Sequence, residues 1–192
     1  MVINKVWIPE GKEDGWEVVR FTVTEEEEKR ASLRAVISFS SRGRYVPAGY
    51  YTALKHHGEI IMSDTPDEMR DFMGAIYKAR GNCLINGLGL GVLLQAILEK
   101  DEVKHVTVIE KEKAVINLVG NFFQEKYGER VEIVEADAFD YKPPKGVHYD
   151  MVWHDIWDNI CVTNLPEMHK LHRKYGRRCT WQGSWCRGRC EY

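Results

Sequence analysis

The sequence predicts an α/β fold: a mostly parallel sheet with helices on both faces, preceded by a small N-terminal β-region and shortened on its C-terminal side. Two observations predict it. Residues 82–95, NCLINGLGLGVLLQ, join a short apolar strand to an apolar helix through three alternating glycines. Short apolar strands and helically spaced apolar residues then alternate along the chain, which is typical of βαβ units with parallel strands. At 192 residues, the chain is long enough for one such domain with its own core.

An N-terminal β-region is expected over residues 1–57. Its strands are predicted from four runs rich in β-branched and aromatic residues: 2–8, 16–23, 33–39 and 45–51, the last two around a turn at 40–43. The acidic run 25–28 is expected to be a solvated turn or the start of a helix. A small sheet of this kind can cover one edge of the main sheet, hold substrate, or form the contact of a homodimer.

The predicted α/β domain spans residues 58–178. A short strand at 60–62 runs into the segment SDTPDE, which has the composition of a helix start. Pro66 suits the first turn, and the acidic pair Asp67 and Glu68 complements the helix dipole. This helix is expected to lead directly into the strand before the glycines.

Three successive predicted strands end in an acidic residue: Glu110, Asp137 and Asp155. A helix over 114–127 separates the first two of these strands. In a parallel sheet the carboxyl ends of the strands share one edge, where ligands of α/β proteins bind. The three carboxylates are therefore expected beside the glycine turn, with Glu110 placed to accept hydrogen bonds from ribose hydroxyls.

The glycine turn indicates a nucleotide-binding site. Gly87 allows the chain to turn with positive φ, and the absence of side chains at Gly89 and Gly91 lets a ligand approach the backbone. The helix that follows offers unpaired N–H groups to a negative group. A dinucleotide fingerprint would require glycine where Val92 stands, and the GK-[ST] element of a phosphate-binding P-loop is absent. The spacing that remains is GxGxG.

Composition excludes several classes of function. The formal net charge of −2 gives no global attraction to nucleic acid or to a membrane surface. No stretch approaches the roughly 18 apolar residues that a membrane helix requires. The five cysteines are an odd number, and two of them, Cys83 and Cys161, fall in apolar segments. A reduced, cytoplasmic protein without a membrane partner is expected.

Residues 179–192 form a basic tail that contains cysteine and tryptophan. Basic charge interleaved with tryptophan can bind single-stranded nucleic acid, but a fifth strand at 178–181 followed by a solvated tail is the favoured interpretation. The histidines and cysteines near this end have the chemistry of zinc ligands: His169, His172, Cys179, Cys186 and Cys190. Only Cys186 and Cys190 have a usable spacing, and no second pair completes a common zinc module, so no metal site is predicted.

Through the GxGxG turn and the acidic strand ends, residues 60–175 resemble the class I S-adenosylmethionine-dependent methyltransferase fold. The resemblance implies a Rossmann-like sheet that binds S-adenosylmethionine. It implies the following contacts to the cofactor: Gly87, Gly89 and Gly91 to its methionine and ribose part, Glu110 to the ribose hydroxyls, Asp137 to the adenine amine, Ala138 or Phe139 to the adenine ring, and Asp155 near the reacting group. Asn86 stands where the family usually has Asp or Glu. Its amide can still hydrogen-bond the cofactor, but it lacks the negative charge that would attract the methionine ammonium.

Within this group the pattern is more similar to the spermidine synthases. That family also has a strand, an acidic pair that opens a helix, and then the glycine turn. It carries an aspartate pair with DxxD spacing, matched here by Asp155 and Asp158. The resemblance implies that Asp155 orients or deprotonates an attacking amine and that Asp158 holds a cationic substrate. The chain departs from the family in having GLGLGV in place of its usual GGGDGG and in stopping soon after the fourth helix.

We therefore predict S-adenosylmethionine-dependent group transfer, with methyl transfer to an unnamed small-molecule or macromolecular acceptor as the first interpretation. One alternative is a spermidine synthase-like aminopropyltransferase that uses decarboxylated S-adenosylmethionine. The other is a protein that binds the nucleoside without catalysis and acts through a partner.

Overall fold

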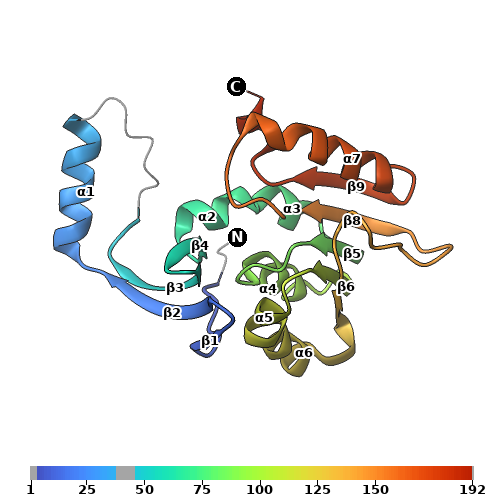
Figure 1. The fold of residues 1–192 in the computed structure, drawn as a ribbon, viewed down its shortest axis with the longest axis horizontal. Helices are drawn as coiled ribbons and strands as arrows, with labels where there is room; N and C mark the ends of the chain where they lie inside the picture. Colours follow the sequence, from blue (N-terminus) through green and yellow to red (C-terminus); the bar gives the residue numbers. More distant parts are fainter. Residues whose placement is uncertain (1–3, 38–45, 192) are drawn as a thin grey trace.

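The computed structural model describes residues 4–37 and 46–191, which form two sheets (Figure 1). The N-terminal sheet is antiparallel, with the order β1 (Gly11–Glu13), β2 (Trp16–Val23), β3 (Gly49–His56) and β4 (Glu59–Ser63). The second sheet is parallel, with the order β7 (Val131–Glu135), β6 (Val103–Glu110), β5 (Gly81–Asn86), β8 (Tyr149–His154) and β9 (Cys179–Ser184). The predicted α/β fold with a small N-terminal β-region is confirmed.

Helices cover both faces of the parallel sheet, as expected (Figure 1). One face packs against α2 (Pro66–Asp71), α3 (Met73–Lys78), α4 (Val92–Leu98) and the continuous run of α5 (Lys113–Val115), η1 (Ile116–Gly120) and α6 (Asn121–Tyr127). The other face packs against α7 (Leu165–Tyr175), which follows the short turn η3 (Val162–Asn164). The structure also has two short helical turns, η2 (Gly128–Arg130) and α8 (Arg187–Cys190). Within the described ranges, no helix is long and apolar enough to cross a bilayer.

The strand expected at 33–39 is wrong over residues 33–37, which belong to the helix α1 (Glu25–Ile37). A reciprocal cap starts this helix: Thr24 Oγ1 accepts a hydrogen bond from Glu27 N at 3.2 Å, and the Glu27 carboxylate accepts one from Thr24 N at 2.8 Å. This capping box fixes the helix start ahead of the apolar residues, so the chain continues as a helix. The rest of the expected strand, the turn at 40–43 and residue 45 lie outside the described residues.

No strand forms over residues 4–10, although the run 2–8 predicted one. Side chains satisfy the backbone there: Val6 N donates to Asp64 Oδ2 at 3.2 Å, and Val6 O accepts from Thr52 Oγ1 at 3.0 Å. The segment therefore attaches to the N-terminal sheet without a ladder of strand hydrogen bonds. Residues 2 and 3 lie outside the described ranges.

Each sheet extends beyond a border that the sequence predicted between parts of the chain. The antiparallel sheet passes the border between residues 57 and 58, and the parallel sheet passes the one between residues 178 and 179. β4 joins the antiparallel sheet because His57 and Gly58, both with positive φ, make a two-residue hairpin turn after β3. The fifth strand expected near 178–181 is confirmed as β9, which pairs with β8 in parallel. The residues after it are not a solvated tail, because Trp185 packs against the core and Cys190 is buried.

Gly91, the residue that precedes α4, gives a test of this packing. It has φ 74°, and a Cβ there would lie 2.2 Å from the fully buried ring of Phe123 on α6. We expect Gly91→Ala to lower the free energy of unfolding by about 3 kcal/mol, through overpacking and backbone strain together. The measurement is urea unfolding followed by circular dichroism.

Gly146→Ala is the matched control, because Gly146 has a similar positive φ (79°) but nothing lies within 4 Å of the added Cβ. In this control, backbone strain alone should lower the free energy of unfolding by about 1 kcal/mol. Equal losses in the two variants would contradict the packing described for α4 and α6.

Candidate functional site

The glycine turn lies directly beside the end of β8. The chain leaves β5 at Gly87 with φ 93°, and a Cβ at this position would lie 1.9 Å from the backbone oxygen of Asp155. Asn86 O accepts a hydrogen bond from Asp155 N at 2.8 Å, so the two chains stay paired past the ends of their strands. Glycine is required here because the Asp155 carbonyl occupies the space of a side chain. The close approach brings Asp155 to the turn.

Glu110, the last residue of β6, accepts a hydrogen bond from the backbone of the glycine turn and so holds the turn in place. Its Oε2 accepts a hydrogen bond from Leu88 N at 2.8 Å, and its Oε1 accepts one from Glu112 N at 2.9 Å. The residue is only 8% exposed. Each carboxylate oxygen has a second lone pair, so the group can still accept a hydroxyl at the edge of the turn. The arrangement fits the ribose contact expected of Glu110.

Asp137 and Ala138 follow β7 on the neighbouring strand end. Ala136 N donates to Glu110 O at 2.9 Å, which ties this loop to the end of β6. Asp137 is exposed, and its Oδ1 accepts from Phe139 N at 2.6 Å. Ala138 is buried against the face covered by α7. The two residues thus lie next to Glu110, but neither is among the lining residues of the cavities described below.

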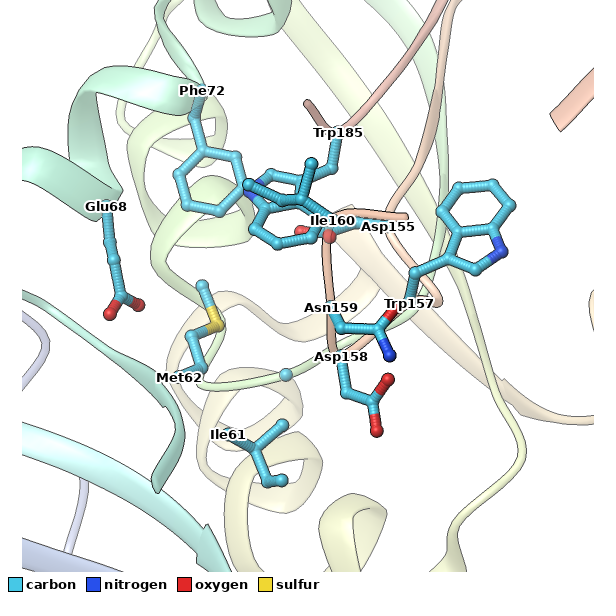
Figure 2. Close-up of a pocket in the computed structure, with 11 residues that line it drawn as sticks. Ile61, Met62, Glu68, Phe72, Asp155, Trp157, Asp158, Asn159, Ile160 and Trp185 are labelled. Carbon is cyan, nitrogen blue, oxygen red and sulfur yellow. The ribbon is translucent and has the colours of Figure 1, made fainter. Parts of the chain in front are cut away.

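A cavity of about 350 Å³ lies beside the turn and reaches Gly89 (Figure 2). It brings two predicted residues together, Asp155 and Asp158, and adds a third carboxylate, Glu68. The rest of the lining is mostly apolar: Ile61, Met62, Phe72, Ile160, Trp157 and Trp185, with Asn159. None of the described residues that line the cavity is a lysine, arginine or histidine. Such a surface suits a cation with an apolar part.

Glu68 was not singled out as a site residue in the sequence because its place in a helix start explained it. In the structure its carboxylate accepts hydrogen bonds from Ser63 N at 2.6 Å and from Ser63 Oγ at 2.9 Å. These contacts hold the side chain between β4 and α2, at the cavity. Trp185 was assigned to a solvated tail, yet its N donates to His154 O at 2.9 Å and its side chain reaches the same cavity.

Met62 of β4 covers part of the glycine turn. Its Sδ accepts a hydrogen bond from Leu90 N at 3.2 Å and lies 2.7 Å from where a Cβ of Gly89 would be. It also lines a narrow cleft of about 10 Å³ that reaches Gly87 and Asp155. A ligand over the turn therefore has to contact or displace this thioether. No sequence pattern pointed to Met62, because it is an apolar residue in an ordinary strand.

Asn86 faces away from the cavity, which argues against the contact to the cofactor expected from its position. Alternate residues of β5 point to opposite faces, and Asn86 shares the α7 face with Leu84. Its side chain is fully buried: Nδ2 contacts His154 Nδ1 at 2.8 Å, and Oδ1 accepts from Tyr175 Oη at 3.5 Å. His154 Nε2 in turn contacts Gln182 Oε1 at 3.3 Å. His154 thus lies on the same face as Asn86, the one covered by α7.

The structure places the other predicted residues in two groups. Gly89, Asp155 and Asp158 line one cavity, while Gly87, Gly91 and Glu110 build the turn beside it. Among the described residues, no group of three or more His, Cys, Asp or Glu side chains is arranged to hold a metal ion.

No protein-family model matches the sequence. The polyamine aminopropyltransferase of Agathobacter rectalis is 27% identical over 112 residues, which are 54% of this chain and 39% of the relative. That of Oceanobacillus iheyensis is 26% identical over 163 residues, 81% of this chain and 28% of the relative. The chain thus spans well under half the length of these curated relatives.

The crystal structure of spermidine synthase from Thermotoga maritima aligns with 90% of this chain and 52% of its own length. The TM-score is 0.52 at 16% sequence identity. The two proteins share the fold.

The buried histidine predicts a pH dependence of stability. Burial, as the largest cause, and the nearby charges of His172 and Lys174 together lower the pKa of His154 to about 3. An unfolded histidine has a pKa of about 6.5, so below that pH the unfolded chain binds a proton that the folded chain excludes. The free energy of unfolding should therefore fall as the pH drops from about 6.5 toward 3. Between pH 7 and 5 the loss from this residue is about 2 kcal/mol.

Urea unfolding at pH 7 and pH 5 checks this. His154→Gln should be less stable at pH 7 but should lose about 2 kcal/mol less than the wild type between the two pH values. His148→Gln removes an exposed histidine and should leave the wild-type dependence intact. An unchanged dependence in His154→Gln would show that this histidine is not buried in its neutral form.

Proposed function

We propose that this domain transfers a group from the sulfonium of S-adenosylmethionine, or of its decarboxylated form, to a nucleophile held in the cavity beside Gly89. One observation carries the proposal: a glycine turn fastened by the carboxylate of Glu110 opens onto a cavity lined by Asp155 and Asp158. The shared fold with a spermidine synthase supports it.

The donor would lie over the glycine turn. Glu110 would hold the ribose hydroxyls, and Asp137 with Ala138 would contact the adenine at the next strand end. The bound sulfonium supplies an activated carbon, so the protein has to align a nucleophile and exclude water. Asp155 lies where the turn meets the cavity, and its carboxylate can orient an amine or take up its proton. Asp158 would hold a positive charge farther from the turn.

Methyl transfer to an acceptor held in this cavity is the first form of the proposed reaction. Aminopropyl transfer is a second candidate, and the cavity lining favours it. Among the described residues, three carboxylates and no cationic side chain line the space next to Gly89, so a donor that has lost its own carboxylate meets less repulsion from them. The two curated relatives are polyamine aminopropyltransferases, which fits this candidate. A cytoplasmic location and a homodimer stay predictions.

Donor binding tests the proposal directly. Isothermal titration should detect binding of at least one of three nucleosides: S-adenosylmethionine, its decarboxylated form or S-adenosylhomocysteine. Tighter binding of the decarboxylated form would favour aminopropyl transfer. Glu110→Ala should weaken binding at least about 10-fold, since it removes both the ribose acceptor and the bond that fastens the turn.

Glu112→Ala is the matched control, because it removes the neighbouring carboxylate but keeps the backbone N–H that Glu110 accepts. It should bind as the wild type does. If none of the three nucleosides binds to the wild type, both transferase candidates fail.

The role of Asp155 is tested by separating binding from turnover. Asp155→Asn keeps the size of the side chain but removes its charge, so donor binding should change little while transfer to a panel of amines drops about 100-fold. Asp158→Asn should instead raise KM for the amine more than it lowers kcat. Normal turnover in Asp155→Asn would exclude Asp155 as the catalytic carboxylate.

A further inference from the structure

A second cavity, of about 190 Å³, lies on the N-terminal sheet and shares no lining residue with the cavity beside Gly89. It is formed by β2, β3 and the segment that precedes β1. Pockets for whole small molecules usually measure roughly 300–1,000 Å³, so this cavity suits a single ring of a longer ligand. Its lining contains four aromatic residues and two cations: Trp7, Phe21, Tyr50, Tyr51, Lys5 and Arg20.

Two of these rings are open to solvent: Trp7 is 61% exposed and Tyr50 is 71% exposed. Arg20 of β2 pairs with Thr52 of β3, and Thr22 pairs with Tyr50, so Arg20 and Tyr50 share one face of the sheet. Trp7 lies close to that face, since Cζ of Arg20 is 5.6 Å from the centre of its ring. Exposed aromatic rings on an antiparallel sheet are a surface on which nucleic-acid bases stack.

The two cations are held at the cavity by contacts to backbone oxygens. Lys5 Nζ donates to Tyr50 O at 2.6 Å, and Arg20 Nη2 donates to Ile8 O at 3.4 Å. The carboxylate of Glu10 accepts from the backbone N of Arg20 and not from its guanidinium. Within the described ranges, neither Lys5 nor Arg20 forms an ion pair. Both side chains have further N–H groups with which to meet an anion.

Asp64 is the one carboxylate among the described residues of this lining, and it is only 1% exposed. Its two oxygens accept hydrogen bonds from Thr52 N at 2.7 Å and from Val6 N at 3.2 Å. Its charge also interacts with that of Lys5, so Arg20 is the cation whose charge is less shared. The cavity can therefore attract an anion locally, although the formal net charge of the chain is −2.

We infer that this cavity binds a nucleotide unit, either as a free nucleotide or within a single-stranded nucleic acid. The base lies against Trp7 and Tyr50, and the phosphate lies at Arg20 and Lys5. A neutral planar compound would leave the cations unused, and an acidic side chain would leave the rings uncovered. The inference goes beyond the proposed function, because it concerns other residues and requires neither the donor nor a transfer step.

Three probes test the ligand class by isothermal titration: thymidine 5′-monophosphate, thymidine and octathymidylate. They contain no adenine, and saturating S-adenosylhomocysteine is present to occupy the glycine turn. The monophosphate should bind at least about fivefold more tightly than thymidine, because only the monophosphate carries the anion. Equal binding of thymidine would overturn the inference, as would equally tight binding of an octapeptide of alternating glutamate and tyrosine in place of octathymidylate.

Octathymidylate distinguishes the two sources of the nucleotide unit. Eight equivalent units raise the apparent affinity only about eightfold over the monophosphate, so a larger gain identifies a strand as the ligand and a smaller one a free nucleotide. Binding of octathymidylate should also weaken about three- to sevenfold between about 50 and 200 mM salt, which corresponds to one or two neutralised phosphates. Binding that does not depend on salt would contradict the contact to the phosphate.

Trp7→Ala and Tyr50→Ala should each weaken binding of octathymidylate about 10-fold through loss of stacking. Both rings are exposed, so the circular dichroism spectrum should stay that of the wild type. Tyr77→Ala is the matched control, because Tyr77 is 81% exposed and lies on α3, outside this lining. Unchanged binding in both ring variants, or equal weakening in Tyr77→Ala, would overturn the inference.

Arg20→Gln should weaken binding of octathymidylate and also reduce its salt dependence, because one phosphate contact is lost. Lys78→Gln is the matched control, since Lys78 is an exposed cation of α3 that does not line this cavity. It should leave both the affinity and the salt dependence at the wild-type values. The same salt dependence in Arg20→Gln as in the wild type would remove the phosphate contact assigned to Arg20.

The outcomes separate this inference from the proposed function. S-Adenosylhomocysteine should not displace the thymidine probes. Displacement would place the probes at the glycine turn, which overturns the inference and leaves the transferase intact. If S-adenosylhomocysteine does not bind, the transferase loses its support, whereas weakened binding of octathymidylate in Trp7→Ala still supports the second cavity.

Discussion

The site depends on one close approach, that of the Asp155 backbone carbonyl to Gly87. Because no side chain stands at Gly87, the chains that leave β5 and β8 continue side by side beyond their last ladder positions. Two consequences follow. The glycine turn is held at the carboxyl edge of the sheet, and the segment after Asp155 becomes one wall of the cavity. A side chain at Gly87 would separate the turn from the carboxylate that the proposed chemistry needs.

The two sheets contribute opposite walls of the same space. β4 of the antiparallel sheet supplies Ile61 and Met62, and the loop after β8 supplies Asp155 and Asp158. The hydrogen bond from Leu90 N to the Met62 thioether joins the two units across the glycine turn. The N-terminal region is therefore part of the site and not only a cover for one edge of the parallel sheet.

Sequence reasoning was strongest where a local pattern has one physical solution. The glycine turn, the strand ends at Glu110 and Asp155, and the alternation of strands and helices all emerged as predicted, because positive φ and apolar periodicity are local properties. The prediction of a strand at 33–39 failed because the cap formed by Thr24 and Glu27 starts the helix α1, which continues through the β-branched residues of that run. The direction of the Asn86 side chain depends on strand register, which the sequence does not show. Trp185 was not found because the segment that carries it is held by a contact between Cys186 and Asp71, which are 115 residues apart.

The order of the parallel sheet has a consequence for how the molecule forms. Its central strand β5 pairs with β8 across a long intervening stretch that includes β6 and β7, and β9 joins last in sequence. Closing such long loops opposes pairing entropically, so we expect the non-local strands to pair late in folding. The space between Met62 and Trp185 consequently does not exist in partly folded chains. Any molecule that fills it will bind only the finished fold, and will shift the folding equilibrium toward it by mass action.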